Sequence, residues 1–160
     1  MPNWVTLELK ERPRPGEVIM LPNGEKVRVK HVGIPWLLPP RAVCNDPRCP
    51  WHGHVKVRGE VIEGRVVSVY MGQVVVLHEW LHYVPKYKRY ERRRRKIHAH
   101  LPPCISVKEG DVVIIGETRP LAKFISFVVL GKRPDDVASV KPEVVGNPGG
   151  VAESASTSGQ

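Results

Sequence analysis

The sequence predicts an all-β protein whose central part is a small closed barrel of five short strands. Between residues 55 and 131, short runs rich in Val and Ile are separated by glycine-containing turns, a pattern typical of strands. The many β-branched residues and the spacing of the glycines disfavour helices there. The longest gap between two runs lies between the second and the third, and a strongly basic stretch fills it.

The N-terminal extension, residues 1–41, is predicted to contain a β-hairpin. Two strand-like runs between residues 17 and 30 flank Asn23-Gly24. This dipeptide suits a two-residue type I′ turn, because both positions of that turn need a positive φ. Val27 and Val29 alternate with basic residues, which predicts one apolar and one basic face. The proline-rich run 34–40 is expected to be extended, since its prolines forbid a helix.

The barrel domain is predicted to span residues 42–131. Its first strand keeps one parity from Val55 onward and slips after Glu63-Gly64. The slip predicts a long strand with a glycine bulge, bent enough to serve two sides of the barrel. After a turn at Met71-Gly72, the second to fifth strands are expected to include residues 74–77, 96–101, 112–115 and 124–130. This order matches the OB fold, a small antiparallel barrel, with a long basic loop between strands two and three.

Residues 132–160 are predicted to form a disordered, faintly acidic tail. From residue 134 onward Lys141 is the only cation against four acids, and the chain ends in Gly, Ser, Ala and Thr. A segment of this composition cannot bury enough apolar surface to fold alone.

The basic stretch runs from His82 to His100. Eight of the eleven residues from Lys86 to Lys96 are Lys or Arg. Self-repulsion makes such a block costly to compact without a counter-charge, and the phosphates of RNA or DNA supply one. Three tyrosines at i, i+4 and i+7 would share one face of a helical turn begun by Pro85. Their rings would serve as stacking platforms for bases or pack on the domain beneath, and the sequence leaves both readings open.

The overall composition narrows the class of partner. The formal net charge of +9 over 160 residues points to a polyanion. The apolar runs are far shorter than the roughly 20 residues that a membrane span needs. Residues 1–15 lack the hydrophobic stretch of a secretory signal, which predicts a cytoplasmic protein. We therefore expect neither a membrane partner nor a small-molecule substrate.

Several ordered blocks resemble a known family. The blocks are GRVVSVYMGQVVV (Gly64–Val76), HYVPKYKRYERRRRKIHAH (His82–His100), EGDVVIIGETRPLAK (Glu109–Lys123) and SFVVL (Ser126–Leu130). Their order and spacing resemble the family of the seventeenth protein of the small ribosomal subunit. The stretch CNDPRCPWHGHVKVRG (Cys44–Gly59) is similar to the archaeal branch of that family.

The resemblance implies a structural constituent of the small ribosomal subunit, located in the ribosome in the cytoplasm and without catalytic activity. It implies an OB barrel that binds small-subunit (16S) rRNA and stabilises RNA helix junctions during assembly. The implied partners are this rRNA and neighbouring small-subunit ribosomal proteins.

The expected RNA contacts combine the basic stretch with the barrel loops. Two loops, after Ser68 and after Leu121, carry fewer cations than the family usually has, so contact by the second rests on Lys123. The predicted RNA-binding residues are Arg65, His82, Tyr83, Lys86, Tyr87, Lys88, Arg89, Tyr90, Arg92, Arg93, Arg94, Arg95, Lys96, His98, His100, Arg119 and Lys123.

One cluster of residues is suited to a metal. Cys44, Cys49 and His52 lie close together in sequence, and Cys104 is a candidate fourth ligand. Three thiolates and one imidazole would close a structural zinc site, although no cofactor is required for the implied function. Two alternatives stay open: buried thiols without a metal, or a Cys44–Cys49 disulfide.

Two other functions fit the sequence less well. A free OB module that binds single-stranded RNA or tRNA would carry aromatic residues along its strands, whereas these strands are rich in Val. A metal-dependent nuclease would need carboxylates near the basic stretch, where they are nearly absent. We therefore predict that the protein is not an enzyme.

Overall fold

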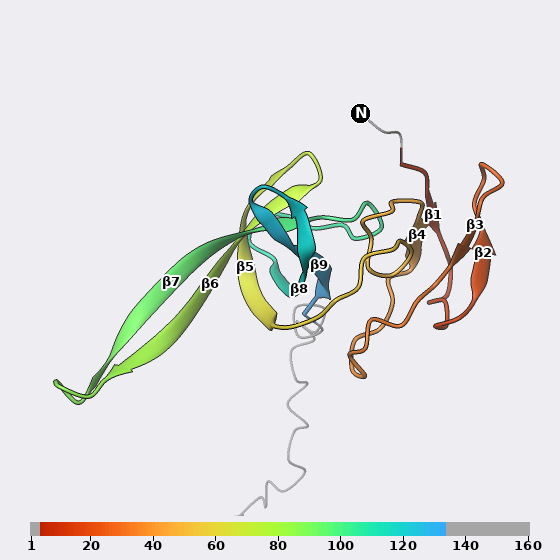
Figure 1. The fold of residues 1–160 in the computed structure, drawn as a ribbon. Helices are drawn as coiled ribbons and strands as arrows, with labels where there is room; N and C mark the ends of the chain where they lie inside the picture. The colour runs from red at the N-terminus through yellow and green to blue at the C-terminus, as the bar shows by residue number, and fades with distance from the viewer. Residues whose placement is uncertain (1–3, 134–160) are drawn as a thin grey trace, which may run out of the picture.

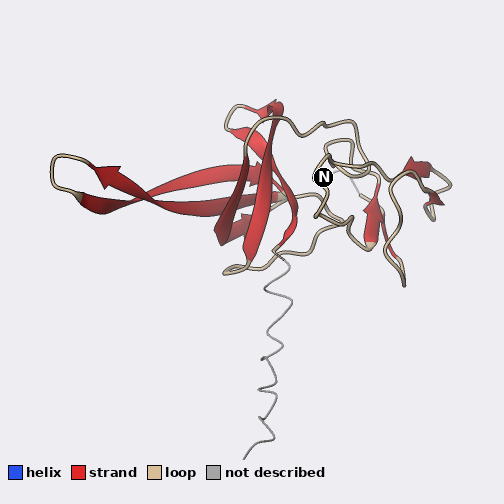
Figure 2. Ribbon diagram, turned by 90° about the horizontal axis from the view of Figure 1, so that it is seen from below, coloured by secondary structure: helices blue, strands red, loops and turns tan. Residues whose placement is uncertain are grey.

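The computed structural model describes residues 4–133, so residues 134–160 of the predicted tail lie outside the described residues. The predicted start of the tail at residue 132 is wrong, because Lys132 ends the last barrel strand and pairs with Val113. The described part is all-β, as predicted, and contains nine strands (Figures 1 and 2). The strands are β1 (Thr6–Glu8), β2 (Val18–Met20), β3 (Lys26–Arg28), β4 (Ala42–Cys44), β5 (Val61–Tyr70), β6 (Gln73–Val84), β7 (Arg89–His100), β8 (Val112–Ala122) and β9 (Ile125–Lys132).

Strands β5 to β9 close into a barrel in the order β5-β6-β7-β9-β8, with β8 pairing back to β5. The predicted five-stranded barrel of the OB type is thereby confirmed. The prediction that the barrel is purely antiparallel is wrong. Strands β7 and β9 run parallel, through the pairs Ala99↔Phe127 and His100↔Val128. An odd number of strands forces this, because neighbours around a closed ring of five cannot all alternate in direction.

Strand β5 bends so that it serves two sides of the barrel, as predicted. Residues 61–65 pair with β8, and residues 65–70 pair with β6. The strand begins at Val61 rather than at Val55. The predicted position of the bulge is also wrong. The register with β6 shifts between Val66 and Ser68, not at Gly64.

Gly64 is instead a point of close approach between β5 and β6. A Cβ at this position would lie 2.4 Å from Cγ1 of Val76 and 2.8 Å from the carbonyl oxygen of Leu77. Only glycine allows the two strands to pack this closely. The change of parity in the sequence therefore reflects two separate features. One is the tight contact at Gly64, and the other is a bulge three residues later.

The two glycine turns differ from one another. Met71 and Gly72 both have positive φ, at 39° and 77°, so the tight turn between β5 and β6 has the two-residue form. In the N-terminal hairpin only Gly24 has a positive φ, and its amide donates to the carbonyl of Leu21 at 2.9 Å. That loop has three residues between Leu21 and Glu25, and the predicted type I′ turn at Asn23-Gly24 is wrong.

The N-terminal part forms two further small sheets, β1-β4 and β2-β3. Val27 and Val29 are buried while Lys26, Arg28 and Lys30 are exposed, which confirms the apolar and basic faces of the hairpin. The β1-β4 pairing crosses the predicted domain boundary between residues 41 and 42.

The proline-rich run 34–40 is not extended throughout. The amide of Leu37 donates to the carbonyl of Ile34 at 3.2 Å, which closes a turn around Pro35-Trp36. The turn carries Leu37 into the barrel's hydrophobic core, where only 8% of its surface is exposed.

Aliphatic side chains from all five barrel strands fill the barrel's interior. The same core includes Trp51, whose Nε1 donates to the carbonyl of Leu130 at 2.9 Å, and the cysteines Cys44, Cys49 and Cys104. The loop that follows β4 is thus packed directly against the barrel.

Candidate nucleic-acid interface and metal centre

Strands β6 and β7 continue far beyond the barrel as a two-stranded ribbon (Figures 1 and 2). Their register is unbroken from Gln73↔His100 to Val84↔Arg89, whereas β5 stops pairing with β6 at Leu77. We call residues 78–95 the arm. The arm is the predicted basic loop, but it is built of strands and ends in a tight turn at residues 85–88, where Lys88 has a φ of 50°.

The predicted helical turn starting at Pro85 is therefore wrong. Tyr83 pairs with Tyr90 across the ribbon, at a distance of 5.1 Å between ring centroids, and Tyr87 lies in the tight turn. Both strands are fixed in the barrel, and cross-strand pairing continues without a break from there to the turn at residues 85–88. This non-local pairing overrides the helix-like spacing of the tyrosines.

The arm has no core. Nothing in residues 78–95 is buried, and Tyr83, Tyr87 and Tyr90 are 45%, 67% and 69% exposed. The open question about the tyrosines is thereby answered: they do not pack on the domain beneath. Both edges of the ribbon are also open over most of the arm, because neither β5 nor β9 reaches it.

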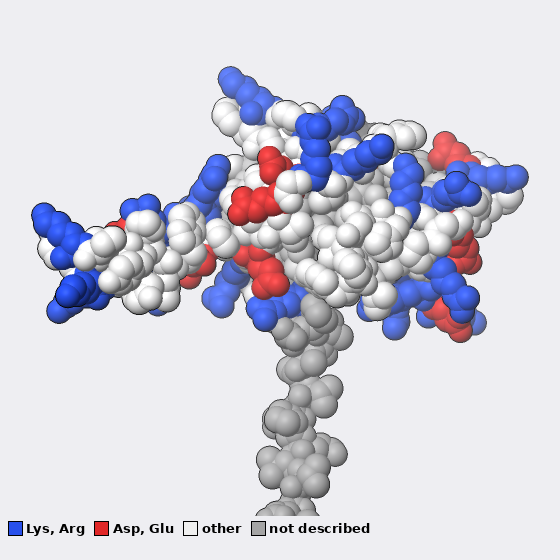
Figure 3. All heavy atoms as spheres, turned by 60° about the horizontal axis from the view of Figure 1, so that its bottom comes forward, with Lys and Arg blue, Asp and Glu red and all other residues white. Residues whose placement is uncertain are grey.

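Charge on the arm is mainly positive, with seven Lys and Arg against Glu79 and Glu91, and Lys and Arg gather at its outer end (Figure 3). All eight cations from Lys86 to Lys96 are exposed. Glu91 forms an ion pair with Arg93, and among the described residues no acid forms an ion pair with the other seven. An array of this kind has a large unsatisfied demand for anions.

The remaining predicted RNA-binding residues lie on the barrel, apart from His82 on the arm. Arg65 and Arg119 are exposed on β5 and β8, and His82 is exposed on the arm. His98 of β7 and Lys123, in the turn between β8 and β9, line one shallow hollow of about 290 Å³. These assignments remain predictions.

His100 is placed differently from the other predicted contacts. Its Nε2 lies 2.7 Å from a carboxylate oxygen of Asp46, which is buried, and only 13% of the histidine side chain is exposed. The pair ties β7 to the loop that follows β4. Contact between His100 and RNA stays a prediction. Within the protein, the contact of His100 is with Asp46.

The four predicted metal ligands converge from distant parts of the chain. Cys44 ends β4, Cys49 and His52 lie in the loop after it, and Cys104 lies between β7 and β8. Nδ1 of His52 is 3.5 Å from Sγ of Cys44 and 3.4 Å from Sγ of Cys49. Sγ of Cys49 is 3.6 Å from Sγ of Cys104, and all four donor atoms lie within 4.8 Å of one another.

Turns hold the loop that carries these ligands. The amide of Cys49 donates to the carbonyl of Asp46 at 3.1 Å, and the amide of Gly53 donates to the carbonyl of Cys49 at 2.8 Å. Gly53 is required here, since a Cβ would lie 2.3 Å from the carbonyl oxygen of Pro47. Nε2 of His52 is buried and has no hydrogen-bond partner among the described residues, so the polar contacts of the ring are with the cysteine sulfurs.

The three thiols are unbridged and buried. Hydrogen bonds from Cys104 and Cys49 lower the pKa of Cys44, whereas burial raises the pKa of Cys49, and contacts with Cys44 and Cys49 raise that of Cys104. A cation at the centre would favour deprotonation of all three.

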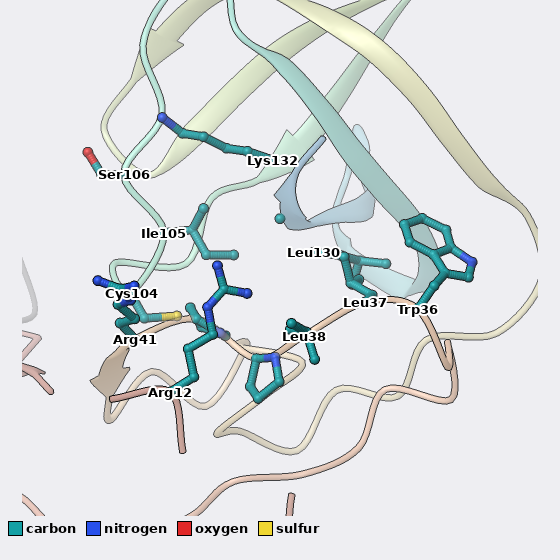
Figure 4. A pocket seen from close by; sticks show the side chains of 13 residues that line it. Arg12, Trp36, Leu37, Leu38, Arg41, Cys104, Ile105, Ser106, Leu130 and Lys132 are labelled. Carbon is teal, nitrogen blue, oxygen red and sulfur yellow. The ribbon is translucent and has the colours of Figure 1, made fainter. Parts of the chain in front are cut away.

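A hollow of about 490 Å³ lies beside this cluster, between the proline-rich run and the barrel (Figure 4). Its lining is mainly apolar, with Arg12, Arg41 and Lys132 among its residues. No pattern in the sequence points to this hollow, because its walls come from four segments far apart in the chain: residue 12, residues 36–41, residues 104–106 and residues 130–132.

The fold and the arm define the chain as an OB-barrel protein whose second and third barrel strands extend into a cationic ribbon. The family profile described as Ribosomal protein S17 matches residues 64–131. On this evidence, together with the relatives below, the chain belongs to the uS17 family of small ribosomal subunit proteins.

The relatives are described as small ribosomal subunit protein uS17 and come from archaea. One from Pyrobaculum aerophilum is 57% identical over 112 residues, which cover 69% of this chain and 91% of the relative. One from Saccharolobus solfataricus is 58% identical over 106 residues, covering 65% and 92%. One from Archaeoglobus fulgidus is 44% identical over 121 residues, covering 76% and 97%.

Membership of this family makes the chain a structural, non-enzymatic component of the small ribosomal subunit, as the sequence predicted. No helix among residues 4–133 is long and apolar enough to cross a membrane.

Proposed function

We propose that the arm binds small-subunit (16S) rRNA and holds RNA helices together at a junction during assembly of the subunit. In this proposal the chain acts within cytoplasmic ribosomes, beside neighbouring small-subunit proteins. The observation that carries it is the exposure of seven cations on a ribbon that has no core of its own.

A two-stranded ribbon is marginally stable in water, and like charges along it repel one another. RNA phosphates relieve that repulsion, and the release of their counterions favours binding. The ribbon is also narrow, and its cations and exposed rings stand on both faces. It can therefore be contacted by RNA from two sides, which is the geometry that a junction requires.

The barrel surface gives less support to the free OB module for single-stranded RNA or tRNA. The exposed aromatic residues of the barrel are Tyr70 and Phe124, which lie at the β5-β6 and β8-β9 turns, whereas the exposed aromatic pairs of β6 and β7 lie in the arm. Arg65, Arg119, His98 and Lys123 would add contacts around the base of the arm.

The first test is RNA binding by an arm variant, R92A/R93A/R94A/R95A. We expect its affinity for a 16S rRNA junction fragment to fall by orders of magnitude while the barrel stays folded. If the wild type neutralises about eight phosphates, its log–log salt dependence should have a slope of roughly −6 to −7. Filter binding over a series of salt concentrations measures both quantities.

A matched control removes the same charge elsewhere. The variant K10A/R14A/K26A/R28A replaces four exposed cations of the N-terminal part. We expect it to bind far better than the arm variant. Equal losses in the two variants would mean that net charge alone governs binding, and a wild-type slope flatter than about −2 would contradict phosphate neutralisation by the arm.

We also propose that Cys44, Cys49, His52 and Cys104 hold a structural zinc ion. Zinc bonds of about 2.3 Å to sulfur and about 2.0–2.1 Å to nitrogen, in tetrahedral geometry, would separate the ligand atoms by roughly 3.6–3.8 Å. The contacts of 3.4, 3.5 and 3.6 Å come close to these values. A disulfide would require sulfurs about 2.0 Å apart, and the cysteines are unbridged.

Such an ion would join the loop after β4 to the connection between β7 and β8, and so fix the N-terminal part to the barrel. We expect about one equivalent of zinc in purified protein, measured by mass spectrometry of the metal. His52→Ala should lose it, whereas the control His54→Ala, an exposed histidine two residues away, should keep it. Less than about a tenth of an equivalent in the wild type would favour the metal-free thiols.

A further inference from the structure

Two pairs of aromatic rings stand on opposite faces of the arm. Partners across an antiparallel ribbon share a face, and successive residues alternate between faces. His78 and Trp80 therefore share one face with Arg95 and Arg93, their cross-strand partners. Tyr83 and Tyr90 lie on the other face. Neither pair has a hydrophobic core beneath it.

The His78–Trp80 pair has the geometry of a flat platform. The rings are stacked, with centroids 5.3 Å apart and planes inclined by 22°. By contrast the planes of Tyr83 and Tyr90 are inclined by 56°, which leaves no common flat surface. Trp80 is 38% exposed, whereas Trp51 in the core is 1% exposed.

His78 anchors this platform to the barrel. Its Nδ1–H donates to the carbonyl of Glu63 in β5 at 2.9 Å, at the point where β6 leaves the barrel. The ring on which Trp80 stacks is thus held by the barrel's backbone. Ordering a ligand against a ring that is already fixed costs less conformational entropy than ordering both.

The charges beside the platform suit a nucleotide. Arg93, opposite Trp80, is held by the carboxylate of Glu91, while Arg95, opposite His78, forms no ion pair among the described residues. Arg95 is therefore available to a phosphate next to the platform. Within the described part of the chain no cation is recorded over the Trp80 ring, although Lys86 lies 5.5 Å from the centroid of Tyr87.

We propose that Trp80, positioned by His78, is a stacking site for one unpaired base of the bound RNA, with Arg95 on an adjoining phosphate. The proposal rests on RNA binding by the arm and assigns one of its faces to an unpaired nucleotide. An aromatic ring stacks on any base without reading its edge, so the site selects an unpaired nucleotide over a paired one. Bases available for such contact occur in loops, bulges and junctions rather than in paired helices.

The test compares two probes that share phosphate charge but differ in bases: a short single-stranded oligoadenylate and inorganic polyphosphate of matched charge. Trp80→Ala should weaken oligoadenylate binding by roughly 5- to 150-fold and leave polyphosphate binding unchanged. His78→Leu should also weaken oligoadenylate binding relative to polyphosphate binding, but by a smaller factor than Trp80→Ala. Trp36→Ala, at a tryptophan that is 57% exposed outside the arm, is the matched control and should change neither affinity.

Two outcomes would overturn the stacking site. Unchanged oligoadenylate binding by Trp80→Ala would show that no base stacks there. Equal weakening for both probes would show that the substitution disturbs the arm as a whole. Either result leaves RNA binding by the arm intact if R92A/R93A/R94A/R95A still loses the rRNA fragment, so the two proposals fail independently.

Discussion

Strands β6 and β7 each belong to two regions, and the contrast between their two halves explains much of the molecule. In the barrel half, Val74, Val76 and Ala99 are fully buried and Ile97 is 5% exposed. In the arm half nothing is buried, although the register between the strands continues unbroken. Pairing is thus the same in both halves, and only the barrel half has a core.

If the arm binds RNA as we propose, stability and binding are separated along the same two strands. The barrel half gains its stability from burial of apolar surface, which scales with the area removed from water. The arm half depends on the barrel to start its register and keeps its side chains free for a partner. Substitutions in the barrel half should therefore change the free energy of unfolding, and substitutions in the arm half should change binding.

The largest effect is expected for Trp51→Ala. Trp51 lies in the loop after β4 and belongs to the barrel's core. The substitution removes a large buried side chain and leaves the carbonyl of Leu130 without its donor. It should lower the free energy of unfolding by about 3–5 kcal/mol, measured by denaturant titration. Trp80→Ala is the arm counterpart, and an equal loss of stability in both would break the comparison.

An intermediate effect is expected for Gly64→Ala, where β5 and β6 approach most closely. The added methyl group would meet Val76 and the backbone of Leu77, at 2.4 and 2.8 Å. Overpacking of this kind costs about 1–3 kcal/mol. Gly110→Ala, with open space around its Cβ position, is a useful reference, although its φ of 91° adds strain of its own. A stability equal to the wild type would show that the two strands can separate without cost.

The smallest effect on stability is expected for Tyr90→Ala in the arm. A cross-strand pair on an exposed ribbon contributes roughly 0.2–1 kcal/mol, and that contribution stabilises the ribbon alone. Hydrogen exchange should become faster for arm amides, while the midpoint of global unfolding stays in place. A clear shift of that midpoint would mean that the arm supports the barrel, contrary to the comparison.

The barrel could be predicted from the sequence because short stretches of sequence already show the patterns of its strands and turns. The alternation around Val74 and Val76, and the turn at Met71-Gly72, need no knowledge of distant residues. The ligand cluster was also predicted as a set, although Cys49 and Cys104 lie 55 positions apart. Cysteine and histidine are distinctive enough to be grouped by chemistry alone.

The arm could not be predicted as strands, because its local pattern favours another structure. The spacing of Tyr83, Tyr87 and Tyr90 fits a helical face, and only the pairing begun in the barrel decides otherwise. The same holds for Asn23-Gly24, which suits two kinds of loop. The register of Met20 with Lys26 selects the longer one. Where partner strands rather than side chains fix the conformation, one segment of sequence is too little information.

The open edges of the arm also matter for the newly made chain. Unpaired strand edges invite other chains to add on, and this is a common route to insoluble aggregates. Two arms that approached edge to edge would each bring seven Lys and Arg side chains against two acids, so we expect mutual repulsion to keep free copies apart. The arginines would then guard solubility between synthesis and incorporation into the particle.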